Sequence, residues 1–146
     1  MDDERHLERH LDLPRGIVWE ALVDPVLTEG WLHPTATLLD DSEQLEFVEP
    51  DSAAPAVVHV VSDEFGDVRV SLTELEGGTR GTSTLVRVTI RGQGDARFRA
   101  PVVATWRTRL DQLEELLRGH PVDWDHWERD HRADYEHYLD EARSAI

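Results

Sequence analysis

Hydrophobic and polar residues alternate near the start of the chain, in the segment HLERHLDL at residues 6–13. A period of two residues is typical of a β-strand with one buried face. The pattern therefore predicts a first strand, which Pro14 ends. One side of this strand carries Leu7, Arg9, Leu11 and Leu13, and the other side carries His6, Glu8, His10 and Asp12.

The spacing of apolar residues then changes to that of a helix. Proline is tolerated in the first turn of a helix, so a helix is expected from Pro14, and Asp24-Pro25 ends it and begins a second one. The second helix is predicted at about residues 25–33. The apolar residues that define the two helices are Ile17, Val18, Ala21 and Leu22 in the first, and Leu27, Trp31 and Leu32 in the second.

A strand-rich region follows, in which turn-forming residues separate short β-type segments. The connections are short, which predicts an antiparallel meander. Both sides of AVVHVVSD carry valine, so the direction of His59 stays open. The predicted strands are TATLL (35–39), QLEFVE (44–49), AVVHVVSD (56–63), DVRVSLTEL (67–75) and TSTLVRVTI (82–90). The core faces predicted for the last two are Val68, Val70 and Leu72, and Val86, Val88 and Ile90.

The longest helical pattern runs from Phe98 to Arg118, and Gly119 followed by Pro121 ends it. The order of elements predicts an α+β fold, in which a curved antiparallel sheet of about six strands wraps around this helix. We assign residues 1–119 to this domain and residues 120–146 to a C-terminal helical extension. The apolar residues of the long helix are Val102, Val103, Trp106, Leu110, Leu113 and Leu117.

The extension carries an aromatic stripe at helical spacing, and the favoured interpretation is a helix docked on its own domain. A homodimer surface and a lid over a cavity are the alternatives. The stripe consists of Trp124, Trp127, His131, Tyr135, Tyr138 and Ala142.

Composition removes several classes of chemistry. The chain has no cysteine and no lysine, which excludes disulfides, cysteine zinc sites, thiolate catalysis and a Schiff-base lysine. Its net charge of -16 opposes binding to nucleic acid or to anionic membranes. No apolar run is long enough to span a bilayer, and the start MDDERHLERH is too charged for a signal peptide. We therefore expect a cytoplasmic protein that does not insert into membranes.

Three segments carry a family resemblance: RHLDLPRGIVWEALVDPVLTEGWL, VRVSLTELEGGTRGTSTLVRV and TWRTRLDQLEELL. In their order and spacing they resemble the START-like, helix-grip superfamily called SRPBCC, and within it the homologues of the activator of heat-shock protein 90 ATPase. The resemblance covers about residues 4–118. The most specific positions are Val18-Trp19, Asp24-Pro25, Trp31, Gly77 to Thr79, Trp106, Leu110 and Leu113.

The resemblance implies a cavity between the sheet and the long helix, closed at one end by the two short helices. Members of this superfamily bind lipids, sterols or polyketides, and some are cyclases, hydrolases or chaperone partners. Because no nucleophile with a base and no acid–base pair is recognisable, we favour non-catalytic binding of a small hydrophobic molecule, with no cofactor. The alternatives are a cyclase-like or hydrolase-like enzyme and a chaperone-type interaction module. The candidate cavity residues are Arg9, Leu11, Trp31, Phe47, Val70, Leu72, Val86, Val88, Phe98, Val102, Trp106 and Leu110.

Two polar features need an explanation. Arg9 shares its side with leucines and therefore requires an anion. We favour an internal carboxylate, with Asp63 as the candidate, over the carboxylate or enolate of a ligand. Asp130, Asp134 and His137 would share a helix face, but a solvated charged face explains them better than a metal site, so no metal is expected.

Overall fold

The computed structural model of this 146-residue chain describes residues 4–32, 44–48, 56–62, 66–91 and 96–144. The strands are β1 (Arg5–Leu11), β2 (Gln44–Val48), β3 (Ala56–Ser62), β4 (Gly66–Glu76) and β5 (Thr82–Arg91). The helices are α1 (Arg15–Val23), α2 (Pro25–Thr28), α3 (Ala96–Leu117), the 3-10 turn η1 (Trp124–His126) and α4 (Trp127–Ser144). None of the helices in these segments is both long and apolar enough to cross a membrane.

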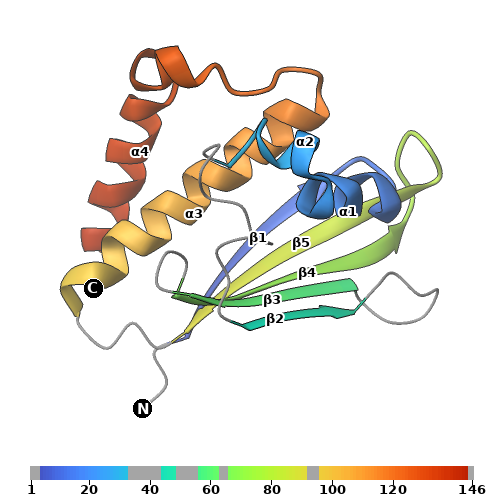
Figure 1. The fold of residues 1–146 in the computed structure, drawn as a ribbon, viewed down its shortest axis with the longest axis horizontal. Coiled ribbons are helices and arrows are strands. Elements are labelled where there is room, and N and C mark those ends of the chain that lie inside the picture. Colours follow the sequence, from blue (N-terminus) through green and yellow to red (C-terminus); the bar gives the residue numbers. More distant parts are fainter. Residues whose placement is uncertain (1–3, 33–43, 49–55, 63–65, 92–95, 145–146) are drawn as a thin grey trace.

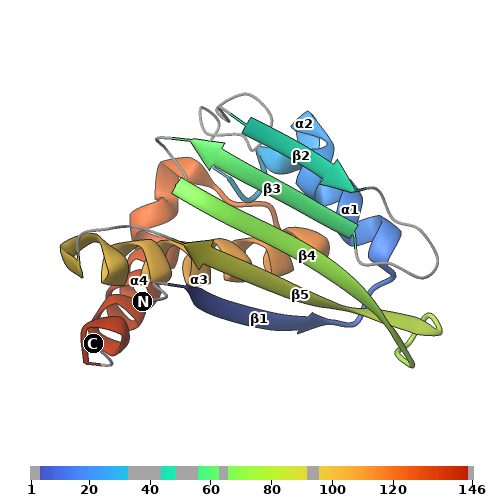
Figure 2. The same cartoon turned by 90° about the horizontal axis from the view of Figure 1, so that it is seen from below.

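The described strands form one antiparallel sheet in the order β1-β5-β4-β3-β2. Figure 1 shows α3 crossing one face of this curved sheet, with α1 and α2 near one end of the helix and α4 near the other. Seen from the opposite face, β1 and β2 form the two edges of the sheet (Figure 2). The predicted meander is confirmed for β2 to β5, and β1 joins it by pairing with β5. The described sheet thus has five of the roughly six strands expected, and the expected strand at 35–39 lies outside the described residues.

The alternation in the sequence correctly assigns the two faces of the sheet. One row of paired residues crosses four strands through Leu7, Val88, Val70 and Val58, and the three valines are buried. The open question about His59 is resolved, because its neighbour Val58 faces the core and His59 lies on the outer face. There its Nε2 lies 2.8 Å from Oδ1 of Asp67 on β4.

The two short helices follow the predicted order. Asp24 caps α2, because its carboxylate accepts a hydrogen bond of 2.9 Å from the backbone N–H of Val26. The expected span of α2 to about residue 33 is wrong, since the helix ends at Thr28. Beyond this end Gly30 packs directly on α3, where a Cβ atom would lie 2.6 Å from Cδ1 of Leu116.

A tight loop joins β4 to β5 and is tied to the end of β1. The carboxylate of Asp12 accepts hydrogen bonds from the hydroxyl (2.5 Å) and backbone N–H (2.9 Å) of Thr79, which lower the pKa of Asp12. Gly78 has a φ of 104°, and a Cβ at this position would collide with the same carboxylate. Glycine is therefore required in the middle of the GGT sequence.

Helix α3 ends where the sequence predicts, through a Schellman motif. Gly119 has a φ of 93°, and its N–H donates to the carbonyl of Leu116. The N–H of His120 donates to the carbonyl of Glu115 at 2.8 Å, which completes the paired hydrogen bonds of this motif. The chain then turns back toward α3.

The extension docks on its own domain, as the favoured interpretation expected. Leu139 of α4 packs with Ala100 and Ala104 of α3, and all three are buried. The prediction that Trp124 begins the aromatic stripe of this helix is wrong, because α4 begins at Trp127. Trp124 belongs to η1, and its indole N–H reaches the carbonyl of Glu29 at 2.8 Å.

Candidate functional site

The candidate cavity residues converge on the inner face of the sheet and the facing side of α3. Eight of them belong to one buried apolar cluster, and Val102 packs against it. The side chains of Phe47 and Phe98 lie outside the described residues. The eight are Leu11, Trp31, Val70, Leu72, Val86, Val88, Trp106 and Leu110.

Two tryptophans are buried between the layers. Trp31 and Trp106 are each 1% exposed, and the indole N–H of Trp31 donates to the carbonyl of Ala21 at 2.7 Å. The hydrogen bond satisfies the one polar atom of a buried ring, so Trp31 is a fixed wall. Trp19 is partly buried against the same cluster.

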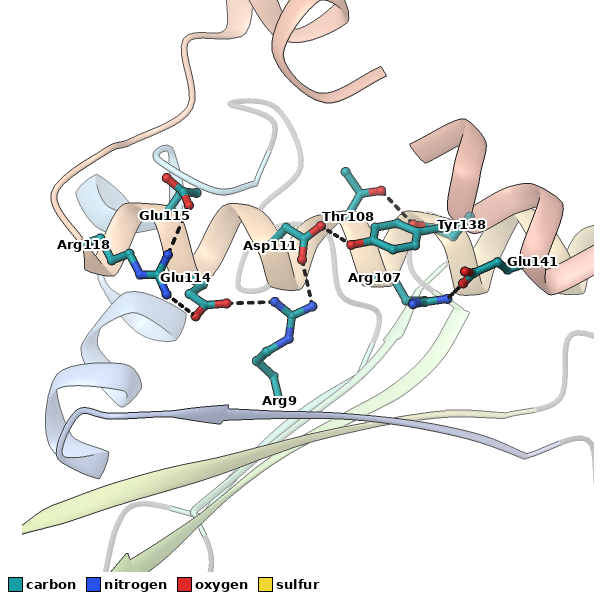
Figure 3. Close-up of polar contacts among 10 residues, drawn as sticks. Arg9, Arg107, Thr108, Asp111, Glu114, Glu115, Arg118, Tyr138 and Glu141 are labelled. Carbon is teal, nitrogen blue, oxygen red and sulfur yellow. Dashed lines mark hydrogen bonds and ion pairs between the residues drawn. The ribbon is translucent and has the colours of Figure 1, made fainter. Parts of the chain in front are cut away.

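Arg9 is a charged residue of this inner face, and it lies at the edge of the apolar cluster. Its Nη2 donates to Oδ1 of Asp111 at 2.7 Å, and its Nη1 donates to Oε1 of Glu114 at 2.8 Å (Figure 3). Burial alone would lower the pKa of Arg9, but the hydrogen bonds to the two carboxylates outweigh it and raise that pKa. Arg9 therefore stays charged and ties β1 to α3.

The internal carboxylate expected for Arg9 is confirmed, and the structure shows two such partners. Asp63 lies outside the described residues, whereas the observed partners come from α3. Asp111 and Glu114 are three residues apart, beside the apolar stripe of that helix. This i, i+3 acidic pair is the sequence signal that could have identified them.

Tyr138 extends this cluster to α4. Its hydroxyl donates to Oδ2 of Asp111 at 2.5 Å, so the carboxylate joins α4 to Arg9 of β1. Burial and this hydrogen bond raise the pKa of Tyr138 to about 12, which keeps the hydroxyl protonated. Arg107 lies over the tyrosine ring at 4.1 Å and pairs with Glu141 at 2.6 Å.

The polar cluster borders two pockets. One, of about 320 Å³, lies at the end of β1 and includes Leu11 and Glu114. The other, of about 470 Å³, lies between α3 and the start of the extension and is lined by six carboxylates. Five of these are already engaged: Asp111 and Glu114 with Arg9, Glu115 with Arg118, Asp123 with His126, and Asp130 with Arg129.

The three residues considered as metal ligands are not brought together as a site. His137 pairs with Glu141 within α4, and Asp130 pairs with Arg129. Across the described segments, no group of three or more His, Asp or Glu side chains has the arrangement needed to hold a metal ion.

Gln112 is a buried polar residue that the sequence reasoning did not single out. Its Nε2 donates to the carbonyl of Trp31 at 2.6 Å, and its Oε1 accepts from the indole N–H of Trp127 at 2.8 Å. The sequence pattern that could have identified Gln112 as buried is a second stripe on α3. Its residues are four positions apart and are small or polar instead of large and apolar. This buried stripe is Ala100, Ala104, Thr108 and Gln112.

A curved antiparallel sheet around one long helix defines a helix-grip-like α+β fold. No protein-family model matches the chain, and no curated protein matches it. Among solved structures, CalU16 from Micromonospora echinospora is similar, with a TM-score of 0.60 and 15% identity over 98% of this chain and 88% of that chain.

Two further structures share this fold. DynU16, a protein in the dynemicin biosynthetic locus, has a TM-score of 0.55 at 20% identity over 83% of this chain. The match spans about half of DynU16, 49% of its chain. MLL2253 from Mesorhizobium loti has a TM-score of 0.51 at 17% identity, with 82% of this chain and 99% of that chain covered. At these identities the likeness concerns the fold alone.

Proposed function

We propose that this chain binds a small hydrophobic molecule between the inner face of its sheet and α3, without catalysing a reaction. The observation that supports this proposal is the composition of the inner face, which is aliphatic and aromatic with Arg9 at its edge. Such a surface matches an apolar ligand and offers little chemistry for transforming one. The residues proposed to line the site are the twelve candidates named from the sequence.

Arg9 contributes to the proposed site as a support and not as the recognition group. Both of its terminal nitrogens already donate to carboxylates of α3. A ligand carboxylate would have to displace Asp111 or Glu114, so selectivity for acidic ligands is not part of the proposal. The resemblance to SRPBCC proteins supports an apolar ligand.

The wider assignment follows from this proposal. Residues 1–119 would form the binding domain and residues 120–146 an extension that braces it, in a cytoplasmic protein. A homodimer formed through the extension remains the alternative for that segment. A chaperone-type module remains an alternative for the whole chain.

The second candidate function is a cyclase-like step in the synthesis of a natural product. The observation that favours it is the similar fold of DynU16, which comes from a biosynthetic locus. A catalytic role would require product formation from a polyketide-type substrate, whereas the binding role requires only retention of the unchanged molecule.

Native mass spectrometry of freshly purified protein, followed by titration with the neutral fluorescent probe N-phenyl-1-naphthylamine, tests the binding proposal. We expect wild type to retain a ligand or to take up the probe. Val70→Phe, which fills the inner face, should weaken probe binding about tenfold or more. Thr73→Phe, on the exposed side of the same strand, should leave binding unchanged.

A different set of results would contradict the binding proposal. If the interior has no room for a ligand, wild type retains nothing and does not bind the probe. Val70→Phe would then destabilise the fold by about 1–3 kcal/mol through overpacking. This combination would contradict the proposal.

A further inference from the structure

We propose a second binding site, between α3 and the extension, that takes a neutral single-ring phenol. It is a pocket of about 200 Å³ that shares no residue with the candidate cavity. The pocket is lined by Thr105, Thr108, Arg109 and Gln112 of α3, Trp124 of η1, and Trp127 and Tyr135 of α4.

The size of the pocket limits its ligand to a small molecule. An engineered apolar cavity of about 150 Å³ holds one benzene ring. A volume of about 200 Å³ therefore accommodates one substituted ring and is too small for a drug-sized ligand.

Indole hydrogen bonds fix two of the aromatic walls in place. Trp127 donates to Oε1 of Gln112 at 2.8 Å, and Trp124 donates to the carbonyl of Glu29 at 2.8 Å. The ring of Tyr135 lies 6.4 Å from that of Trp127, inclined at 57°. A ligand ring would therefore meet preformed aromatic surfaces and lose little affinity to ordering them.

Two hydroxyl groups give the pocket its polar specificity. The hydroxyls of Thr105 and Tyr135 form no hydrogen bond to any residue of the described segments. By contrast, the hydroxyl of Thr108 donates to the carbonyl of Ala104 at 2.9 Å. A hydroxyl group can both donate and accept, so a phenolic ligand matches these two groups.

Charge favours a neutral and electron-rich ring. The net charge of -16 disfavours anionic ligands. Arg109 adds a positive charge at the pocket, with its guanidinium 4.8 Å from the centre of the Trp106 ring. A positive charge disfavours organic cations and is attracted to the face of an electron-rich aromatic ring.

The test is titration of the full chain with p-cresol, followed by NMR of the five tryptophan indole N–H signals. We expect shifts at Trp124 and Trp127, while Trp31 of the interior stays unchanged. A shift at Trp31 without shifts at Trp124 and Trp127 would overturn this proposal and would support the interior site, so the two proposals fail independently.

Variants give a second readout that does not depend on fold disruption. Thr105→Leu fills the pocket and should weaken p-cresol binding at least about tenfold, whereas Val103→Leu on the same helix should not. Tyr135→Phe should weaken p-cresol binding about three- to tenfold, as expected for one lost hydrogen bond, and leave toluene binding unchanged. Equal p-cresol affinity for wild type and Thr105→Leu would overturn the proposal.

Two other outcomes would also overturn it. One is the absence of any indole shift at millimolar p-cresol. The other is a shift of Trp124 and Trp127 with protein concentration alone, because a second copy of the chain would then occupy the pocket.

Discussion

Arg9 shows how much a single charged side chain can hold together in this protein. Its side chain is 27% exposed, and the side chains of its partners Asp111 and Glu114 are each 24% exposed. Arg9→Met would leave two partly buried carboxylates without this cation, so we expect a loss of about 1–3 kcal/mol in the free energy of unfolding. Urea denaturation measures it.

Arg87 on β5 is the matched control for this substitution. It pairs with Glu8 on the outer face, where the two side chains are 51% and 46% exposed. Arg87→Met should cost under about 0.5 kcal/mol, because exposed ion pairs contribute little. Equal losses for the two variants would mean that the contacts of Arg9 contribute no more than a surface ion pair.

The sequence predicts which way Arg9 points but not what it contacts. Strand alternation is local, so Leu7, Arg9 and Leu11 could be placed on one face from a period of two residues. The partners Asp111 and Glu114 lie more than a hundred residues away. Their position depends on how α3 crosses the sheet, and no local pattern contains that information.

At the scale of elements, the docking of α4 depends on the hydroxyl group of Tyr138 and not on that of Tyr135. Tyr138→Phe removes the hydrogen bond to Asp111, so we expect docking to weaken by about 1–2 kcal/mol. Tyr135→Phe, the matched control, removes a hydroxyl without a partner in the described segments and should change stability little. Hydrogen exchange of the α4 amides measures both. Similar protection in the two variants would contradict this role for Tyr138.

The same hydrogen bond makes the docking of α4 sensitive to high pH. The pKa of Tyr138 is raised from 10.0 to about 12, so the folded state favours the neutral hydroxyl. The stabilisation is therefore complete below pH 10 and is lost as the pH rises through 12. In the exchange measurements, the protection of α4 in wild type should approach that of Tyr138→Phe over this interval.

The extent of α4 illustrates a limit of pattern analysis. Spacing alone places Trp124 on the stripe, because the period gives no sign that η1 precedes the helix. The most deeply buried residue of α4, Leu139, was omitted although it lies four residues after Tyr135. The small residues of α3 that receive it were also missed, because a search for large apolar residues passes over alanine.

For the whole molecule, the net charge of -16 predicts an unusual response to salt. Self-repulsion of like charges destabilises the folded state, and salt screens it. We expect the melting temperature at pH 7.5 to rise by roughly 2–8 °C between 20 and 500 mM NaCl, in proportion to about 1–2 kcal/mol of relieved repulsion. Scanning calorimetry measures this change.

The control is the same salt change at pH 5. Near the isoelectric point of about 4.7 the net charge is small, so salt should have little effect. Asp12 still supports the β4–β5 loop there, since a carboxylate with a lowered pKa loses its contribution only at more acidic pH. A melting temperature that falls with salt at pH 7.5 would show that ion pairs outweigh the repulsion.

Gln112 restricts how this protein can be recombined with others. Its amide donates to the carbonyl of Trp31, in the turn after α2, and accepts from Trp127, the first residue of α4. Neither glutamate nor leucine can fill both roles. Transplanting the extension onto another helix-grip-like scaffold would therefore require an amide at the equivalent position. Conversely, a chimera that keeps Gln112 but replaces the extension would leave a buried carbonyl oxygen without its donor. Helix α3, which carries Gln112, and the extension are therefore expected to be exchanged, or to change in evolution, as one unit.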